Sequence, residues 1–191
     1  SVQRYLTSAN PVIFISRDGW RLPAVAGKLM TRTKSPNPKR RMGLYKRFDS
    51  VPTKHRLDRY NVEYEGQDVW AEFERTRNDE FDSEAYRNTL KKTERTWKAH
   101  MSNRGRHHAL ARPRDVETWC ADLATDRKLE TVYKEYWIRL EEFYSWLQTH
   151  IDHPHVYQPV LMAAASHEIA RAVWWVKMDH NKAALGGVND D

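Results

Sequence analysis

The chain has few of the residues that form covalent or metal cross-links. Its 191 residues include a single cysteine, Cys120, so neither an intramolecular disulfide nor a site with several thiolates can form. Glycine is scarce, and the phosphate-binding motifs G-x-x-x-x-G-K and G-x-G-x-x-G are absent. The nucleophile motif G-x-S-x-G is absent as well. No complete active site is therefore recognisable, and we expect a protein without enzymatic activity of its own.

Long apolar runs are also missing. No stretch approaches the roughly 20 apolar residues needed to cross a bilayer, and the first residues lack the apolar core of a secretory signal. We therefore expect a soluble, cytoplasmic protein that has no membrane partner.

Positive charge is concentrated near the start of the chain. Residues 1–60 contain 14 Lys or Arg and 3 Asp or Glu, a balance of +11, whereas residues 61–191 contain 18 and 23, a balance of −5. This division predicts a basic arm that contacts a polyanion, joined to a body that cannot bind one through net charge alone.

Residues 1–78 are predicted to form this basic N-terminal extension. Residues 11–26 have the pattern of a short β-hairpin. Residues 28–59 are rich in proline and cations, so we expect them to be mobile without a partner, as either a nucleic-acid-binding arm or a solvated linker. Residues 60–73 fit a second hairpin or a turn before a short helix.

Residues 79–185 are predicted to form a mainly α body of four or five helices, followed by a tail over 186–191. In the first helix, Asp82 or Ser83 is the cap and Gly105 marks the end. Its apolar stripe consists of Tyr86, Leu90, Thr93, Trp97 and Met101. A second row lies about 120° away on the same helix, and it is either a solvated face or a phosphate-binding one. This row consists of Arg87, Lys91, Arg95 and Lys98.

Three further segments complete the expected bundle. Pro113 fits the first position of a short second helix. Residues 129–151 form the third and most apolar helix, which is stable only when packed against others. Its stripe consists of Leu129, Tyr133, Tyr136, Leu140, Phe143 and Leu147, widened by Trp137, Tyr144 and Ile151. Residues 159–180 have helical spacing throughout and are predicted to form the fourth helix.

Nine histidines suggest a metal site, particularly His150, His153 and His155, with His167 further along the chain. The cluster spans a proline and has no carboxylate or thiolate at a recognised interval. We therefore expect no metal site and no cofactor, and we expect these imidazoles to cap a helix end or to pack beneath a turn. Cys120 lies on the apolar side of its helix and is expected to be buried.

Residues from about Asp82 to Tyr157 resemble the SAM-like N-terminal core-binding domain of tyrosine recombinases, the phage integrase family. The resemblance rests on three helical segments and the turn DHPHVYQPV that follows them. The segments are AYRNTLKKTERTWKAHMSNRG, RPRDVETWCADLA and ETVYKEYWIRLEEFYSWL.

The resemblance implies a bundle that clamps duplex DNA mainly through phosphates, in the context of DNA recombination or integration. The family's catalytic domain, with its H-x-x-R pair and nucleophilic tyrosine, is missing here. The chain is then either a fragment of a recombinase or a standalone DNA-clamping protein, located in the cytoplasm on the nucleoid or other DNA. A recombinase catalytic domain or a second copy of the chain is a further partner to consider.

We therefore predict that the first and third helices contact duplex DNA while the basic arm wraps or follows it. The predicted DNA-binding residues are Lys34, Lys39, Arg40, Arg41, Lys46, Arg47, Arg87, Lys91, Arg95, Lys98, Arg112, Arg114, Arg127, Lys128, Thr131 and Lys134. The alternative is a protein-interaction adaptor. It is favoured by the eight tryptophans, of which the adjacent Trp174 and Trp175 cannot both face one core.

Overall fold

The computed structural model describes residues 35–76 and 83–186, with side chains as far as Asn181. The predicted hairpin over residues 11–26 lies outside these ranges. The helices are α1 (Val69–Arg75), α2 (Glu84–Ser102), α3 (Pro113–Ala124), α4 (Leu129–Val132), α5 (Ile138–Thr149), α6 (Pro159–Ser166) and α7 (Glu168–Gly186). The described ranges contain no strand, so the predicted mainly α class is confirmed for them.

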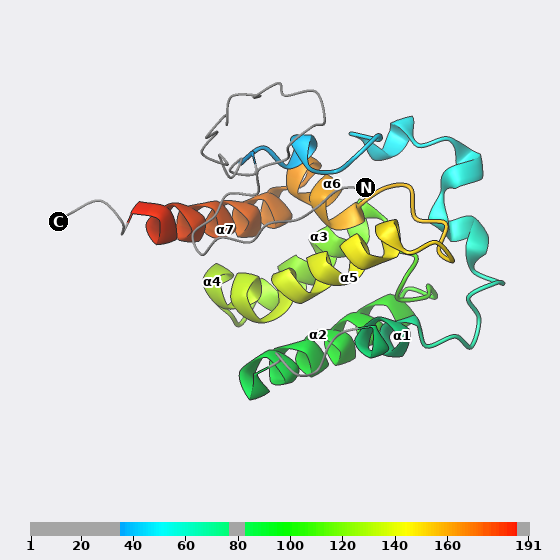
Figure 1. The fold of residues 1–191 in the computed structure, drawn as a ribbon, viewed down its shortest axis with the longest axis horizontal. Coiled ribbons are helices and arrows are strands. Elements are labelled where there is room, and N and C mark those ends of the chain that lie inside the picture. Colours follow the sequence, from blue (N-terminus) through cyan, green and yellow to red (C-terminus); the bar gives the residue numbers. More distant parts are fainter. Residues whose placement is uncertain (1–34, 77–82, 187–191) are drawn as a thin grey trace, which may run out of the picture. The chain divides into compact units, whose positions relative to one another are not determined.

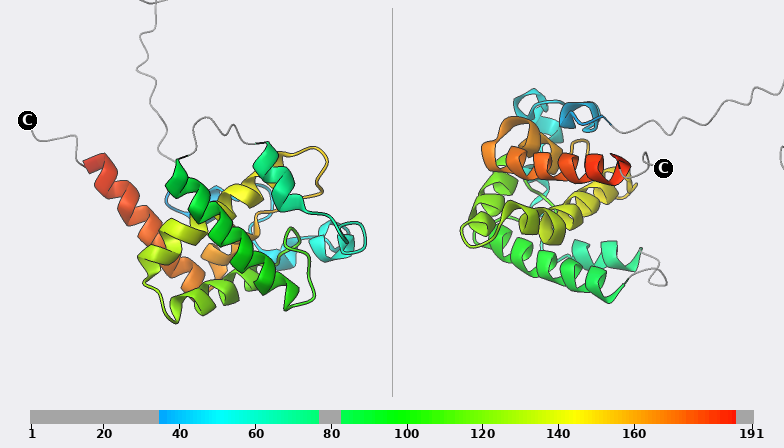
Figure 2. Two further views of the ribbon diagram at one scale, coloured as in Figure 1. Left: turned by 90° about the horizontal axis from the view of Figure 1, so that it is seen from below. Right: turned by 90° about the vertical axis from the view of Figure 1, so that its left-hand side faces the viewer.

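Within the described residues, the helices form three layers. Helices α6 and α7 make one outer layer, α1 and α2 make the other, and α3, α4 and α5 lie between them (Figures 1 and 2). The middle layer is covered on both sides. Its central helix, α5, therefore buries large side chains on more than one face, including the fully buried Leu140, Phe143 and Tyr144.

Helix α2 has the predicted boundaries. The Ser83 side chain accepts a hydrogen bond from the Tyr86 N–H at 3.2 Å, and Gly105 follows the helix with a φ of +63°. The predicted stripe is its packed face, with Trp97 and Met101 fully buried. Pro113 opens α3 as predicted.

The helix over 129–151 is confirmed with two differences. A π-helical turn, Tyr133–Trp137, joins α4 to α5, and the helix ends at Thr149. The π turn widens the buried face, so that Tyr133, Tyr136 and Trp137 are all buried. Ile151, which was assigned to the stripe, lies beyond the helix end and is 95% exposed.

The predicted single helix over 159–180 is broken into α6 and α7 at His167, where the backbone is extended. The carboxylate of Glu117, on α3, accepts the Ile169 and Ala170 N–H groups at 3.0 and 2.8 Å. It thereby caps the start of α7 with negative charge. Counting α4 and α5 as one helix that continues through Tyr133–Trp137, this break and α1 bring the helices in the described ranges to six, above the predicted four or five.

The folded unit begins well before the predicted boundary at residue 79. Residues 35–60 form a series of 3₁₀ turns: Pro38–Arg40, Phe48–Ser50, Thr53–His55 and Leu57–Tyr60. Met42, Val51 and Leu57 are buried in the common core. The described part of the basic segment is thus packed, contrary to the expectation of a mobile arm. For residues 60–73, the structure selects the turn followed by a short helix, α1.

The connector between α2 and α3 runs through the protein core. His108, Ala109, Leu110 and Ala111 are buried in a non-helical conformation, so their backbone polar groups need partners from other elements. The His108 carbonyl accepts from Trp97 Nε1 at 2.8 Å and from the Tyr144 hydroxyl at 2.9 Å. Tyr144 in turn accepts the Ala111 N–H at 3.1 Å, and His155 Nε2 bonds the Ala109 carbonyl at 2.7 Å.

Replacing Tyr144 with phenylalanine should destabilise the fold. The His108 carbonyl would keep its bond from Trp97, but the buried Ala111 N–H would lose its acceptor, at a cost of about 1–3 kcal/mol. Chemical denaturation should show a lower midpoint with an unchanged slope. The control is Tyr133→Phe, because Tyr133 is also a buried residue but its hydroxyl makes no hydrogen bond with the described residues. Equal stability of the two variants would contradict this account of the connector.

His108 should also make stability dependent on pH. Burial lowers its pKa to about 3, with His107 and Lys98 adding to the effect and Asp68 opposing it. A histidine in the unfolded chain titrates near pH 6.5. Below that pH, the unfolded state therefore binds a proton at His108 that the folded state does not bind. The free energy of unfolding should therefore fall as pH is lowered, by up to about 1.4 kcal/mol per pH unit from this group.

The matched variant is His108→Gln, whose amide oxygen can still accept the Trp70 N–H that His108 Nε2 accepts at 3.2 Å. Denaturation measured at several pH values between about 6 and 5 should show a shallower pH dependence for this variant. Identical slopes for the variant and the native chain would show that His108 does not carry the effect.

Candidate nucleic-acid interface

The cation row on α2 is exposed in its first three members. Arg87, Lys91 and Arg95 make no side-chain hydrogen bond or ion pair with any described residue. Successive members are about 6 Å apart along the helix axis, since each residue rises about 1.5 Å. The fourth member is different, because Lys98 pairs with Asp68 at 2.8 Å and with Glu94 at 2.6 Å.

Acidic residues border this row. Burial and the charge of Glu94 raise the pKa of Glu74, whereas Lys98 and Lys91 act in the opposite direction. Asp68, which caps the start of α1, neutralises Lys98. The flank of α2 that faces α1 is therefore a mixed surface, with net positive charge concentrated at Arg87, Lys91 and Arg95.

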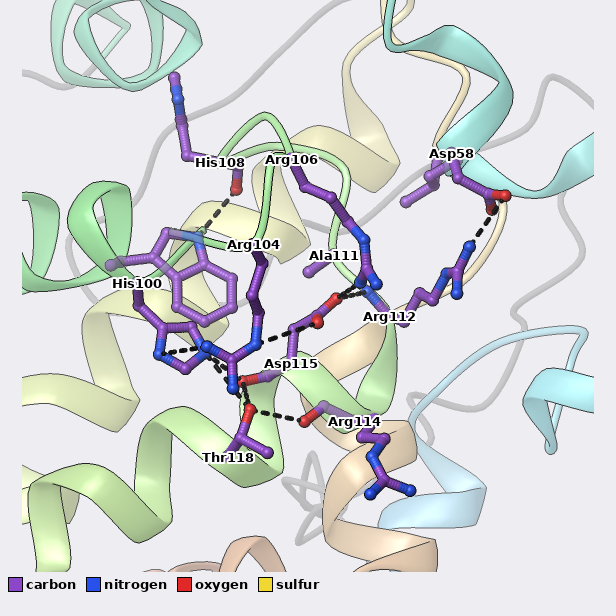
Figure 3. A network of polar contacts seen from close by, with 12 residues as sticks. Asp58, His100, Arg104, Arg106, His108, Ala111, Arg112, Arg114, Asp115 and Thr118 are labelled. Carbon is purple, nitrogen blue, oxygen red and sulfur yellow. Dashed lines mark hydrogen bonds and ion pairs between the residues drawn. The ribbon is translucent and has the colours of Figure 1, made fainter. Parts of the chain in front are cut away.

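Most cations of the α2–α3 connector are used internally. Figure 3 shows the buried Asp115 carboxylate between Arg104, Arg106 and the backbone of Arg112. The Arg112 N–H donates to Asp115 at 2.8 Å, which caps α3, and the Arg112 side chain pairs with Asp58 at 3.1 Å. Arg114 is exposed and points away from this network (Figure 3). Arg112 and Arg114, at the start of α3, were both predicted to bind DNA, and within the described ranges only Arg114 has a side chain without such pairing.

Some of the DNA-binding residues predicted in the arm are also bonded within the protein, and others are exposed. Arg41 donates to the Ser35 carbonyl at 2.6 Å and lies over Trp174, with 5.0 Å to the ring centroid. Lys46 bonds the Gly43 carbonyl, and Arg47 pairs with Asp49 at 2.6 Å. Lys39 and Arg40 are exposed, and their side chains make no hydrogen bond or ion pair with the described residues. Lys34 lies outside the described residues.

The DNA-binding residues predicted around α4 also differ in their exposure and pairing. Arg127 pairs with the adjacent Asp126 and lies over Tyr136, while Lys128 is exposed. Thr131 is half-buried, and its backbone N–H is bonded to the Lys128 carbonyl. Lys134 is exposed in the π turn. Its neighbour Glu135 pairs at 2.8 Å with Lys92, which lies about 100° around α2 from Lys91.

The structure does not bring these groups onto one surface. Lys39 and Arg40 lie in a turn that packs on α6, and Trp174 of α7 donates to the Pro36 carbonyl at 2.8 Å. This layer is separated from α2 by the middle layer (Figure 1). A single surface formed by the arm and α2, as predicted from the sequence, is therefore not present in the described residues.

The histidines and the cysteine complete the candidate chemistry. Cys120 is buried as predicted, and burial raises the pKa of its thiol, which makes it unreactive at neutral pH. His155 is buried and bonded to the connector, whereas His150 and His153 lie beside Glu72 of α1. Glu72 was missed because it is far from these histidines in sequence, and no local spacing signals their proximity.

None of the helices in the described ranges is long and apolar enough to cross a membrane.

No protein-family model, curated protein or solved structure matches this chain. The resemblance to the tyrosine recombinase core-binding domain therefore stays a prediction from the sequence.

Proposed function

We propose that the chain binds duplex DNA through phosphate contacts made by the exposed face of α2. The observation that supports this proposal is the row of Arg87, Lys91 and Arg95 on one helix, whose side chains are exposed and make no ion pair or hydrogen bond with the described residues. Cations that are already paired must break those pairs before they can bind a phosphate. Unpaired ones need only release the solvent around them, so they give the largest electrostatic gain.

Binding of this kind positions DNA and carries little sequence information. The proposed role is therefore non-catalytic, as expected for the DNA-clamping half of a recombinase or for a standalone protein that retains this half. The proposed DNA-contacting surface is restricted to α2 because Lys39 and Arg40 lie on the opposite side of the middle layer. In this proposal they are outside the DNA-contacting surface.

Two matched double variants test the proposal. Arg87→Gln/Lys91→Gln and Lys39→Gln/Arg40→Gln each remove one arginine and one lysine, and all four residues are exposed. Duplex binding is measured by fluorescence anisotropy over a range of salt concentrations. The α2 variant should reduce the slope of log affinity against log salt by about 1.8, at about 0.9 per phosphate contact. The other variant should leave the slope unchanged.

Two results would overturn the proposal. One is the absence of salt-dependent duplex binding by the native chain at low salt. The other is a loss of slope in the Lys39/Arg40 variant with none in the α2 variant, which would place the DNA on the α6–α7 layer.

A protein-interaction adaptor is the second candidate, and the exposure of Trp175 favours it. Trp174 is fully buried, but its neighbour Trp175 is 48% exposed. Trp175 borders a hollow of about 370 Å³ that is also lined by Pro36, Pro38 and Ala165. An exposed aromatic side chain beside an apolar hollow is typical of a site that anchors a partner helix.

Replacing Trp175 with serine tests this candidate. If the hollow mediates association, the native chain should show a concentration-dependent mass by light scattering, and the variant should remain monomeric at every concentration. The control is Leu44→Ser, because Leu44 is 78% exposed and does not line the hollow. A constant monomeric mass for the native chain, together with retained duplex binding, would favour the DNA-binding function.

A further inference from the structure

Three side chains of metal-ligand type meet where α5 ends. Glu72 comes from α1, His150 follows the last residue of α5, and His153 lies in the next turn. One potential ligand atom of each lies within 4.8 Å of the other two. His153 Nε2 and Glu72 Oε2 are 3.5 Å apart. Two ligand atoms on a tetrahedral zinc ion, with bonds of about 2.0–2.1 Å, are about 3.4 Å apart. This pair therefore already has the required spacing.

The environment of His153 gives independent support for a ligand at this place. The His153 side chain is only 5% exposed, yet its Nε2 makes no hydrogen bond and has only the contact with Glu72 Oε2 at 3.5 Å among its ion pairs. Buried polar atoms without a hydrogen bond are rare, because they lose their hydration with little compensation. The other ring nitrogen, Nδ1, is 2.8 Å from the hydroxyl of Tyr64, which is itself buried. In the tautomer in which Nδ1–H donates to Tyr64, Nε2 carries a free lone pair beside Glu72.

The surroundings hold both imidazoles in place. The Trp146 ring packs against His150 and His153, with centroid distances of 4.8 and 5.1 Å. Asp152 Oδ2 lies 3.8 Å from His150 Nδ1 and adds a second negative charge at the rim. The hydrogen bond that Nδ1–H of His153 donates to the Tyr64 hydroxyl is the kind of outer contact that orients metal-binding histidines.

We propose that Glu72, His150 and His153 bind one divalent transition-metal ion of the zinc class. Two imidazoles and one carboxylate suit such an ion, and three protein ligands leave a fourth coordination position for water or an exogenous ligand. The bound ion would connect α1, which carries Glu72, to the segment after α5, which carries both histidines.

The test uses the full chain without a polyhistidine tag, and Co²⁺ is the probe because its visible absorption reports coordination. The native chain should bind one Co²⁺ per molecule, and Zn²⁺ should displace it. Glu72→Gln and His150→Gln should each weaken binding by more than the roughly 10- to 100-fold expected for loss of an outer contact. Tyr64→Phe should fall within that smaller range.

Matched controls are available for both ligand variants. Glu74→Gln changes another half-buried glutamate of α1, and His167→Gln changes another half-buried histidine. Both should bind Co²⁺ as the native chain does. Zn²⁺ should also raise the thermal unfolding midpoint of the native chain and of these controls but not that of Glu72→Gln, because only the folded site binds the ion.

Two outcomes would overturn the proposal. The first is the absence of stoichiometric Co²⁺ or Zn²⁺ binding by the native chain, which would leave His153 and Glu72 as an ordinary ion pair. The second is binding that Glu72→Gln and His150→Gln weaken no more than the two controls do. Circular dichroism of the metal-free variants shows whether each is folded before the titration.

Discussion

The buried connector between α2 and α3 is the constraint on which the described fold depends. A non-helical backbone inside a core must find partners for its N–H and C=O groups, and here these partners are side chains. Trp97 on α2, Tyr144 on α5 and His155 beyond α5 each bond a connector residue. Their polar atoms, as well as their size, therefore determine how the outer layer of α2 is joined to the middle layer.

The sequence was sufficient where structure is determined locally. The cap at Ser83, the proline at the start of α3 and the apolar stripe of α5 are all signals that act within a few turns of one helix. It was insufficient where distant residues decide the outcome. The break at His167 depends on Glu117 of α3, and the packing of residues 35–60 depends on contacts with segments that come later in the chain, such as α6, Tyr157 and Trp174.

The same distinction applies to the candidate sites. The helical wheel places Arg87, Lys91, Arg95 and Lys98 in one row, but only the folded chain shows that Lys98 is neutralised by Asp68. The histidines near the end of α5 were evident in the sequence, whereas their carboxylate comes from a helix more than 70 residues earlier. Sequence thus identifies which groups are present, and tertiary pairing determines which of them can still bind a ligand.

Helix α1 links the two proposed sites. Its N-cap Asp68 pairs with Lys98 at the end of the α2 row, and one turn later Glu72 faces His153. Trp70 and Phe73 of the same helix pack on Phe143 of α5, with ring centroids 4.6 and 5.5 Å from that of Phe143. With only seven residues, α1 is too short to be stable alone, so its position is set by these contacts. In the two proposals, a metal ion held by Glu72 would therefore also fix where the negative charge of Asp68 lies beside the cation row of α2.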